Sequence, residues 1–351
     1  MLVLSNIVSI ADPSTIVIIS LCSKNAKRAI KSVGRFEKWQ LRMQNGINPR
    51  AMLSYEETII CHLDVLGVRS VSEMLTNKNS ETVTIGNSRV PVLLNNKCLN
   101  CYCDDDQNVT WVPVPVMGYC LDTYWEDRIE GLKQVIEYVS DLFHLCVSHV
   151  NIGRGDEWVL AWIKHRQNEK LKIVTLDVLK SECYSKEELE LVLSTPTELL
   201  DVCALAPENF RFTGNFPIVN QISIQPGKWI TVGDLMKIDS TECFLCETTL
   251  SGIDINQFLH FWIEGGSPRL QYLQVNTEKF LNFSSIFGND GIEFRLEETQ
   301  EVRLYYPRPF GTKFLFKGGY TIQRKNGSKA TIKYYRNDFL MVIWPQSIVS
   351  D

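Results

Sequence analysis

The sequence predicts a mixed α/β (α+β) fold in three parts: a short N-terminal helical element, an irregular arc of helix–strand units, and a C-terminal antiparallel hairpin and meander. Three observations support this prediction. Apolar residues recur at helical spacing near the N-terminus, residues 156–178 and 254–275 share one helix-then-strand pattern, and Asn326-Gly327 joins two alternating segments. With 351 residues, of which 44% are apolar and 22% charged, the composition is that of a globular protein with a sizeable core.

Charge and cysteine content narrow the classes of partner. A net charge of −5 does not favour a general nucleic-acid or membrane-surface binder. Residues 2–22 are apolar, but no Lys or Arg precedes them and Asp12-Pro13 interrupts them, so we expect neither a signal peptide nor a membrane anchor. Eleven cysteines, an odd number, predict reduced thiols and a location in the cytosol or nucleus.

Residues 1–45 are expected to be helical. Leu4, Ile7, Val8 and Ala11 form one face of a first helix. Asp12 as the cap and Pro13 at the first position predict a second helix that ends at Gly34. Val17, Ile18 and Leu21 lie off the main apolar stripe, so this helix has a second apolar face for the rest of the chain or for another protein. A buried strand over residues 16–19 is the alternative.

Residues 46–127 predict a mixed linker region with a helix and a hairpin. Residues 58–66 present an apolar face typical of a helix, made by Ile59, Ile60, Leu63 and Leu66. Gly86-Asn87, between two β-rich runs, predicts the hairpin. The prolines of residues 111–116 restrict that strand-like run to an edge or an extended arm.

Residues 128–280 alternate helical and strand patterns. Residues 130–142 form an amphipathic helix, and the stretches 156–178 and 254–275 each contain an N-capping Asp, a helix with Trp-Ile, a polar loop and a short strand. Helix–strand pairs are also expected at 186–204 and 231–246. This alternation predicts a leucine-rich-repeat-like arc, with a mixed α/β sandwich as the alternative.

Residues 281–351 are expected to form β-structure. Residues 320–324 and 329–334 alternate around Asn326-Gly327, the strongest short hairpin signal in the sequence, and residues 339–344 would add a third strand.

The sequence contains no recognisable catalytic constellation. The pairs Cys98/Cys101 and Cys243/Cys246 lie too far apart for a zinc ribbon, so we expect buried thiols there. Gly153-Arg-Gly155 precedes a helix, but Trp158 at the third glycine position argues against a dinucleotide loop. The five histidines show no metal-binding spacing. We therefore expect no catalytic residue, metal or cofactor.

The N-terminal helices resemble a known adaptor-binding module. Asp12-Pro13, Ile19-Ser20-Leu21, Ser23-Lys24 and the basic residues after them are similar to the middle and end of a nematode-type F-box. An F-box docks on the S-phase-kinase-associated adaptor of a cullin–RING (SCF) ubiquitin ligase. F-boxes usually open with a Leu-Pro pair, and this chain begins inside the first helix, so a truncated F-box is expected. The resemblance implies that the adaptor-binding residues are Leu4, Ile7, Val8, Val17, Ile18, Leu21 and Lys24.

A second resemblance covers the later part of the chain. "LSGIDINQFLHFWIEGGSPRLQYLQV", residues 250–275, resembles the motif of the F-box-associated domain type 2 of nematode F-box proteins. Residues 229–252 and the C-terminal "GGYTIQRKNGSKATIKYY" and "FLMVIWP" are also similar, and the motif is expected over about residues 205–275. The residues implied to maintain its structure are Trp162, Ile163, Phe258, Trp262, Ile263, Pro268, Leu270 and Leu273.

The two resemblances imply a non-enzymatic substrate-recognition subunit of a ubiquitin ligase. It would bind the adaptor through its N-terminal helices and an unknown protein target through its C-terminal domain, with no nucleic-acid or membrane partner. One alternative is a target-binding or scaffold protein without ligase coupling. Another, from a different class, is an unrecognised hydrolase or transferase, which a deep pocket with converging His, Cys and carboxylate groups would favour.

Overall fold

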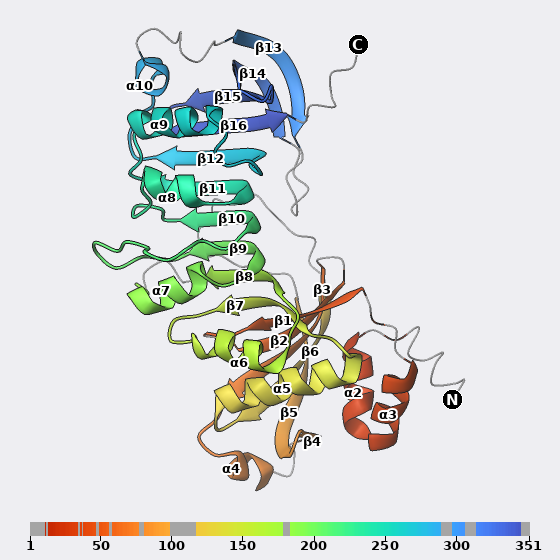
Figure 1. Ribbon diagram of the computed structural model, residues 1–351. Helices are drawn as coiled ribbons and strands as arrows, with labels where there is room; N and C mark the ends of the chain where they lie inside the picture. The colour runs from red at the N-terminus through yellow and green to blue at the C-terminus, as the bar shows by residue number, and fades with distance from the viewer. Residues whose placement is uncertain are drawn as a thin grey trace. The chain divides into compact units, whose positions relative to one another are not determined.

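The computed structural model divides the chain into two compact units, Met1–Leu171 and Lys172–Asp351, which are taken in turn (Figure 1). In the part of the chain that is described, no helix has the length and apolarity needed to cross a membrane. The described residues are 11, 13–33, 36, 38–46, 49–55, 58–76, 81–98, 117–177, 183–288, 297–305 and 314–344.

The first unit is built on a mixed sheet with strand order β7-β1-β2-β3-β6-β5-β4. β1 pairs in parallel with β7, and β3 pairs in parallel with β6, while the other neighbours are antiparallel. The elements are α2 (Pro13–Cys22), α3 (Lys24–Val33), β1 (Trp39–Gln44), β2 (Arg50–Tyr55), β3 (Thr58–Gly67), α4 (Val71–Thr76), β4 (Glu81–Ile85), β5 (Ser88–Cys98), β6 (Met117–Trp125), α5 (Arg128–Phe143), β7 (Val147–Ile152) and α6 (Trp158–Arg166).

The helix α5 confirms the amphipathic pattern of residues 130–142. Asp127 begins it by accepting hydrogen bonds from the backbone N–H groups of Ile129 and Glu130. A Cβ at Gly131 would lie 2.5 Å from the indole of Trp125, so only glycine lets the helix approach the sheet this closely. The predicted apolar face is fully buried and comprises Leu132, Val135, Ile136, Val139 and Leu142.

The N-terminal helices pack on this sheet and do not form a separate element, so that part of the fold prediction is wrong. Ser20 Oγ and Tyr138 Oη, on α2 and α5, are 2.8 Å apart, and α2 contacts β3 and β6. The single long helix is also wrong, because Ser23 Oγ accepts hydrogen bonds from the next turn and starts a new helix. Residues 16–19 lie in helix α2, so the alternative of a buried strand there is wrong. Leu4, Ile7, Val8, Asp12 and Gly34 lie outside the described residues.

The helix predicted over residues 58–66 is wrong: these residues lie in strand β3. Cys61, Leu63 and Val65 alternate into the core, a period of two that the run of apolar residues obscured. His62 and Asp64 therefore share the opposite face of the strand. The hairpin around Gly86-Asn87 is confirmed by β4 and β5, and the strand-like residues 111–116 lie outside the described part.

The second unit contains strands in the order β13-β14-β15-β16-β12-β11-β10-β9-β8. Strands β9 to β12 are parallel, whereas β12, β16, β15, β14 and β13 pair antiparallel. The elements are β8 (Leu171–Asp177), α7 (Lys186–Leu193), β9 (Thr197–Cys203), β10 (Val219–Gln225), α8 (Val232–Lys237), β11 (Ser240–Thr248), α9 (Gly252–Ile263), β12 (Tyr272–Thr277), α10 (Phe283–Phe287), β13 (Glu297–Tyr305), β14 (Phe314–Gln323), β15 (Lys329–Tyr335) and β16 (Asp338–Trp344).

The leucine-rich-repeat-like arc is therefore wrong. The helices α7, α8 and α9 lie on one face of parallel strands, as the alternation predicts (Figure 1). However, β16 pairs antiparallel with β12, and the sheet continues into the C-terminal hairpins as one mixed sheet. Alternating helices and strands predict parallel crossovers in any α/β sheet, and only long-range strand pairing distinguishes a mixed sheet from a solenoid. The hairpin at Asn326-Gly327 and the strand at 339–344 are confirmed.

Capping boxes start four helices of the second unit, and in α10 the pair is Asn282 and Ser285. Ser185, Thr231 and Ser251 each exchange hydrogen bonds with the acidic residue three positions later, which is Asp254 in α9. Asp254 is thus the third helical residue and not the cap that the sequence predicted. In the first unit, the carboxylate of Asp156 accepts from Gly153 N, and α6 starts after Glu157 without a side-chain cap.

Candidate functional site

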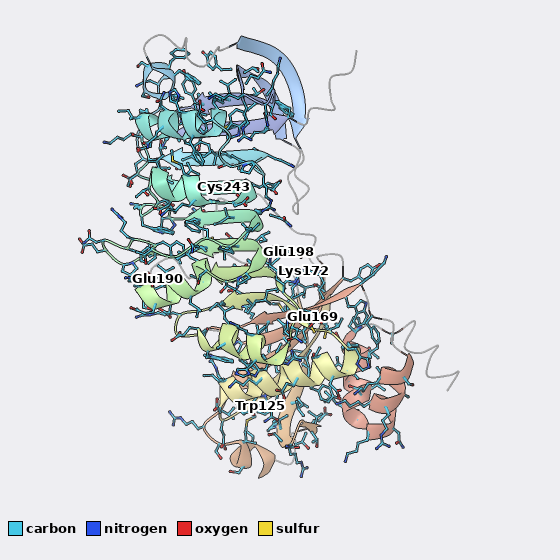
Figure 2. The ribbon with its side chains drawn as sticks, in the orientation of Figure 1. Trp125, Glu169, Lys172, Glu190, Glu198 and Cys243 are labelled. Atoms are coloured by element: carbon cyan, nitrogen blue, oxygen red, sulfur yellow. The ribbon has the colours of Figure 1, made fainter. Side chains whose placement is uncertain are left out.

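The sheet of the second unit has two chemically different faces. Leu200, Ile222 and Cys243 lie side by side across β9, β10 and β11, and all three are buried on the face that carries the helices. Figure 2 labels Cys243 in this row. Because side chains alternate along a strand, the neighbouring residues Asp201, Ser223 and Phe244 lie on the opposite face. This row is only half-buried and continues through Gln274 on β12 and Leu340 on β16.

This second face combines carboxylates with aromatic rings, and we call it the acidic face; it comprises Asp201, Glu242, Phe244, Tyr272 and Asp338. The rings of Phe244 and Tyr272 are 5.2 Å apart between centroids. Glu242 on β11 lies beside Tyr272 on the adjacent strand β12. Leu340 and Trp344 pack against the same aromatic cluster. Carboxylates beside aromatic faces suit a cationic side chain, because both attract positive charge.

The pKa shifts of two neutral groups show the negative potential of this face. Burial raises the pKa of the Tyr272 hydroxyl, and the nearby charges of Glu242 and Asp338 raise it further. Burial also raises the pKa of the Cys246 thiol, with added contributions from Asp338, Glu247 and Asp201. Several carboxylates therefore act on the same small area.

Asn276 contacts the Asp338 carboxylate and the backbone of the nearby Glu247 without supplying positive charge. Its Nδ2 donates to Asp338 Oδ1 at 2.8 Å, and its Oδ1 accepts from the backbone N–H of Glu247 at 3.4 Å. Gln225 Nε2 donates to Glu247 Oε1 at 3.3 Å. Within the described residues, neither Asp338 nor Glu247 forms an ion pair with Lys or Arg, so both remain able to receive a cation.

Two buried polar groups lie at the amino ends of the same strands. Gln221 and Ser240 are 7% and 3% exposed, and within the described part of the chain Gln221 Oε1 and Ser240 Oγ have no hydrogen-bond partner. Gln221 pairs with Glu242, and Ser240 pairs with Val219, so the two groups are close neighbours on the acidic face. A buried polar group normally has a partner, so these two atoms are exceptions within the described residues.

The residues implied to maintain the F-box-associated motif lie mainly in the core of this unit. Trp262, Phe258 and Leu273 are fully buried, Leu270 is 6% exposed, Ile263 is half-buried, and Pro268 is exposed. The guanidinium of Arg324 lies 4.6 Å from the centroid of the Trp262 ring. Trp162 and Ile163 lie in α6 of the first unit, where Ile163 is buried and Trp162 is half-buried.

The predicted adaptor-binding residues have different environments in the first unit. Val17 is 1% exposed and buried, whereas Ile18 and Leu21 are half-buried and Lys24 is exposed. The described part of the predicted patch is thus limited to Ile18, Leu21 and Lys24. The remaining three residues, Leu4, Ile7 and Val8, lie outside the described residues.

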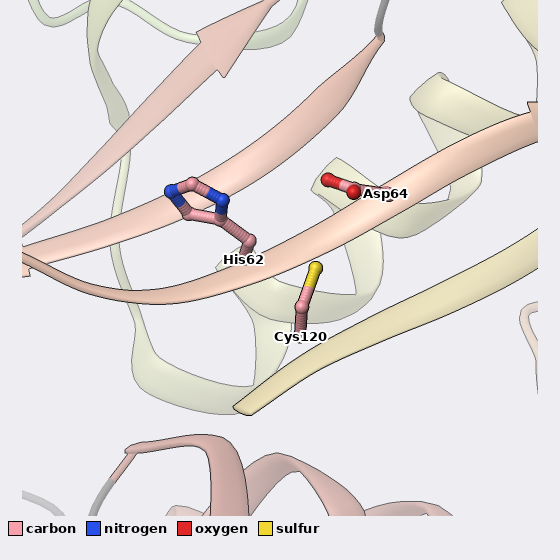
Figure 3. Close-up of side chains that lie close together, drawn as sticks. All are labelled: His62, Asp64 and Cys120. Atoms are coloured by element: carbon pink, nitrogen blue, oxygen red, sulfur yellow. The ribbon is translucent and has the colours of Figure 1, made fainter. Parts of the chain in front are cut away.

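One cluster with metal-ligand chemistry lies in the first unit. The ligand atoms of His62, Asp64 and Cys120 are all within 4.8 Å of one another (Figure 3). Converging His, Cys and carboxylate groups are also the feature that would favour a hydrolase. However, Cys120 is 0% exposed and its thiol faces Asp122 Oδ1 at 3.8 Å, so it is not accessible as a nucleophile.

Sequence reasoning missed both the acidic face and this cluster. The residues of the acidic face alternate with the buried apolar residues along β9 to β12. Assigning alternate residues of each strand to opposite faces would have separated the two sets. The His62, Asp64 and Cys120 cluster could be found only if residues 58–66 were predicted as a strand, because a strand places His62 and Asp64 on one face. In β11, Cys243 is buried and Cys246 is half-buried.

Comparisons with known proteins assign one region of the second unit. The model of a protein family described as "F-box associated" matches residues 211–275, which contain β10, α8, β11, α9 and most of β12. An F-box itself is not detected. A segment of 90 residues is 26% identical to the E3 ubiquitin-protein ligase hecw-1 of Caenorhabditis elegans and covers 26% of this chain and 7% of that protein. No solved structure matches the chain. Residues 211–275 are therefore an F-box-associated region, and they contribute the central strands of the acidic face.

Proposed function

We propose that the chain is a non-enzymatic recognition protein that binds a protein target on the acidic face of its second unit and acts in a ubiquitin-ligase context. The observation that carries the proposal is the position of the F-box-associated region: β10, β11 and β12 bear Gln221, Glu242 and Tyr272 on that face. The similarity to a nematode ubiquitin ligase supports the context. We also propose that the F-box-associated region is of type 2 and that the chain is of nematode origin.

The target segment is proposed to carry Lys or Arg. Asp338 accepts a hydrogen bond from Asn276, and Glu247 accepts one from Gln225. The aromatic pair of Phe244 and Tyr272 lies on the same face, where the charge of Asp338 acts on the Tyr272 hydroxyl. A basic side chain of the target would be attracted by the carboxylates and by the aromatic rings of this face. Charge complementarity of this kind affects specificity and association rate most strongly.

The matched pair Asp201→Lys and Glu198→Lys tests the target-binding face. Both residues lie on β9 and both changes add the same charge, but Asp201 is on the acidic face and exposed Glu198 (labelled in Figure 2) is on the other. We expect D201K to lose proteins that wild type and E198K both retain in affinity purification from cells. These proteins should also become longer-lived when the chain is depleted. Equal loss with both variants, or with neither, would contradict the proposed face.

Adaptor binding through the N-terminal helices is a separate part of the proposal. Ile18, Leu21 and Lys24 retain surface for such a contact, whereas Val17 is buried within its own unit. Co-purification of adaptor and cullin should fall with Ile18→Asp and persist with Ser32→Asp, which places the same charge on exposed surface of α3. Absence of adaptor with wild type would support the alternative of a target-binding scaffold without ligase coupling. Location in the cytosol or nucleus stays a prediction.

A further inference from the structure

The register of β3 and β6 brings four chemically reactive side chains together in the first unit. These strands are parallel, with His62 beside Cys120 and Asp64 beside Asp122. Residues two apart on a strand share a face, so all four side chains lie on the same side of the sheet. Figure 3 shows His62 and Asp64 on one strand and Cys120 on its neighbour.

The donor atoms of this cluster match the preferences of a zinc-type ion. Imidazole nitrogen, thiolate sulfur and carboxylate oxygen are the three zinc ligand types in proteins, whereas magnesium and calcium prefer oxygen alone. A tetrahedral zinc site with bonds of about 2.0–2.3 Å separates its ligand atoms by roughly 3.3–3.8 Å. The ligand atoms of His62, Asp64 and Cys120 already lie within 4.8 Å of one another, so small side-chain rotations would close the site.

We propose that His62, Asp64 and Cys120 bind a divalent transition-metal ion of the zinc class, with Asp122 as the fourth donor. Asp122 Oδ1 lies 3.8 Å from Cys120 Sγ, within the range of a shared tetrahedron. The four residues are 0–7% exposed, which leaves no coordination position open to solvent. The site is therefore structural and links β3 to β6. On binding, the Cys120 thiol loses its proton to solvent and the thiolate bonds to the metal, so affinity falls at low pH.

Arg50 contacts two of these side chains. Its Nη1 lies 3.3 Å from His62 Nδ1, and its Nε lies 3.4 Å from Asp64 Oδ1. A metal bound by His62 and Asp64 would displace this guanidinium, because both are positively charged and both contact these two side chains. Asn95 Nδ2 donates to Asp122 Oδ2 and would orient that carboxylate from outside the site.

The test measures metal bound by the full chain after chelator treatment, using added Zn²⁺ and then Co²⁺ as a spectroscopic substitute. We expect one zinc per chain at this site and, with cobalt, the absorption of a tetrahedral ion bonded to sulfur. Cys120→Ser should remove the sulfur-to-cobalt absorption and weaken zinc binding by more than about tenfold. Cys61→Ser is the matched control, because Cys61 is equally buried on the same strand pair but points to the other face.

One further variant and one further measurement keep the result interpretable if Cys120→Ser folds poorly. Arg50→Gln should bind zinc more tightly than wild type, since the competing cation is gone, whereas an ion-pair network without a metal role predicts no change. Zinc should raise the unfolding temperature of wild type and C61S but not of C120S. The proposal is overturned if wild type binds no zinc, if C120S binds as tightly as wild type, or if binding depends instead on Cys101 and Cys103, which lie outside the described residues.

Discussion

The guanidinium of Arg324, on the turn after β14, lies over the indole ring of Trp262 at the end of α9, 4.6 Å from its centroid. The same side chain donates from Nε to the Trp262 carbonyl at 2.8 Å and from Nη2 to the Gly266 carbonyl. Burial lowers the pKa of this guanidinium, but it stays charged at neutral pH. Arg324 thereby joins the C-terminal hairpin to the F-box-associated region, although it lies 62 residues beyond Trp262 in sequence.

Arg324→Ala is expected to reduce the free energy of unfolding of the second unit by about 2–4 kcal/mol, because it removes the ring contact and the charged donor shared by the Trp262 and Gly266 carbonyls. Arg324→Lys should recover only part of the loss, since an ammonium lacks the planar fork. Lys325→Ala is the control: its ion pair with Glu264 is exposed on both sides and should contribute less than about 1 kcal/mol. Urea unfolding would measure all three, and equal effects at 324 and 325 would contradict the assigned role.

Gly252, the first residue of α9, is close to α10. A Cβ at this position would lie 2.5 Å from Ser285 Cβ and 3.1 Å from its backbone carbonyl carbon. We expect Gly252→Ala to destabilise the second unit by about 1–3 kcal/mol through overpacking. Gly233→Ala in α8 meets nothing nearer than 3.6 Å and should be neutral or stabilising by up to about 1 kcal/mol. Thermal unfolding of the two variants checks the difference, and a stable G252A would show that α10 can move away.

Asp141 on α5 joins this helix to α3 through two lysines. Lys27 Nζ and Lys31 Nζ lie 2.9 and 2.5 Å from its carboxylate oxygens. Burial acts to raise the pKa of Asp141, but the two lysines outweigh it and hold the pKa below 3.8. The stabilisation is therefore present above about pH 3.8 and is lost as the pH falls through the lowered pKa.

Asp141→Asn should remove this acid-dependent contribution, which we expect to be below about 1 kcal/mol because the carboxylate is partly exposed. The measurement is the difference in unfolding free energy between variant and wild type at about pH 5 and about pH 3. The difference should shrink as the pH falls. Glu137→Gln on the exposed side of the same helix is the control, and the same pH trend in both variants would count against the lysine contacts.

Tyr138 is the second link between α5 and the N-terminal helices. Burial raises the pKa of its hydroxyl to about 12, with smaller contributions from Asp141 and Cys22, while the hydrogen bond with Ser20 acts in the opposite direction. The stabilisation is present below the ordinary pKa of 10.0 and is lost as the pH rises through about 12. Subtracting the ultraviolet titration of Tyr138→Phe from that of wild type should leave one phenol that ionises near pH 12. A difference curve centred near 10.0 would show that the hydroxyl is exposed.

Local elements of the fold could be predicted because their signals are local. The apolar spacing of α5 and the Asn326-Gly327 turn depend on residues within one helix or one hairpin. In the F-box-associated region, the helices and strands between residues 231 and 275 also follow from such patterns. The run at 58–66 failed because several successive residues of β3 are apolar, which satisfies helical and strand periods together.

The functional surfaces could not be predicted, because each depends on strand pairing across long stretches of sequence. His62 meets Cys120 only through the parallel register of β3 and β6, and Asp338 reaches the acidic face only because β16 pairs with β12. By contrast, the second apolar face predicted for the N-terminal helix did indicate a packing surface. The sequence could not show that Val17 is buried within its own unit.

The pairing of β16 with β12 also determines which fragments of this protein can be studied. A fragment ending at Val275, where the family match stops, would leave the backbone of β12 unpaired along one edge. Exposed edges of this kind recruit other chains and promote aggregation. Binding measurements on the F-box-associated region should therefore use a polypeptide that extends to Trp344, so that a failure to bind is not mistaken for self-association.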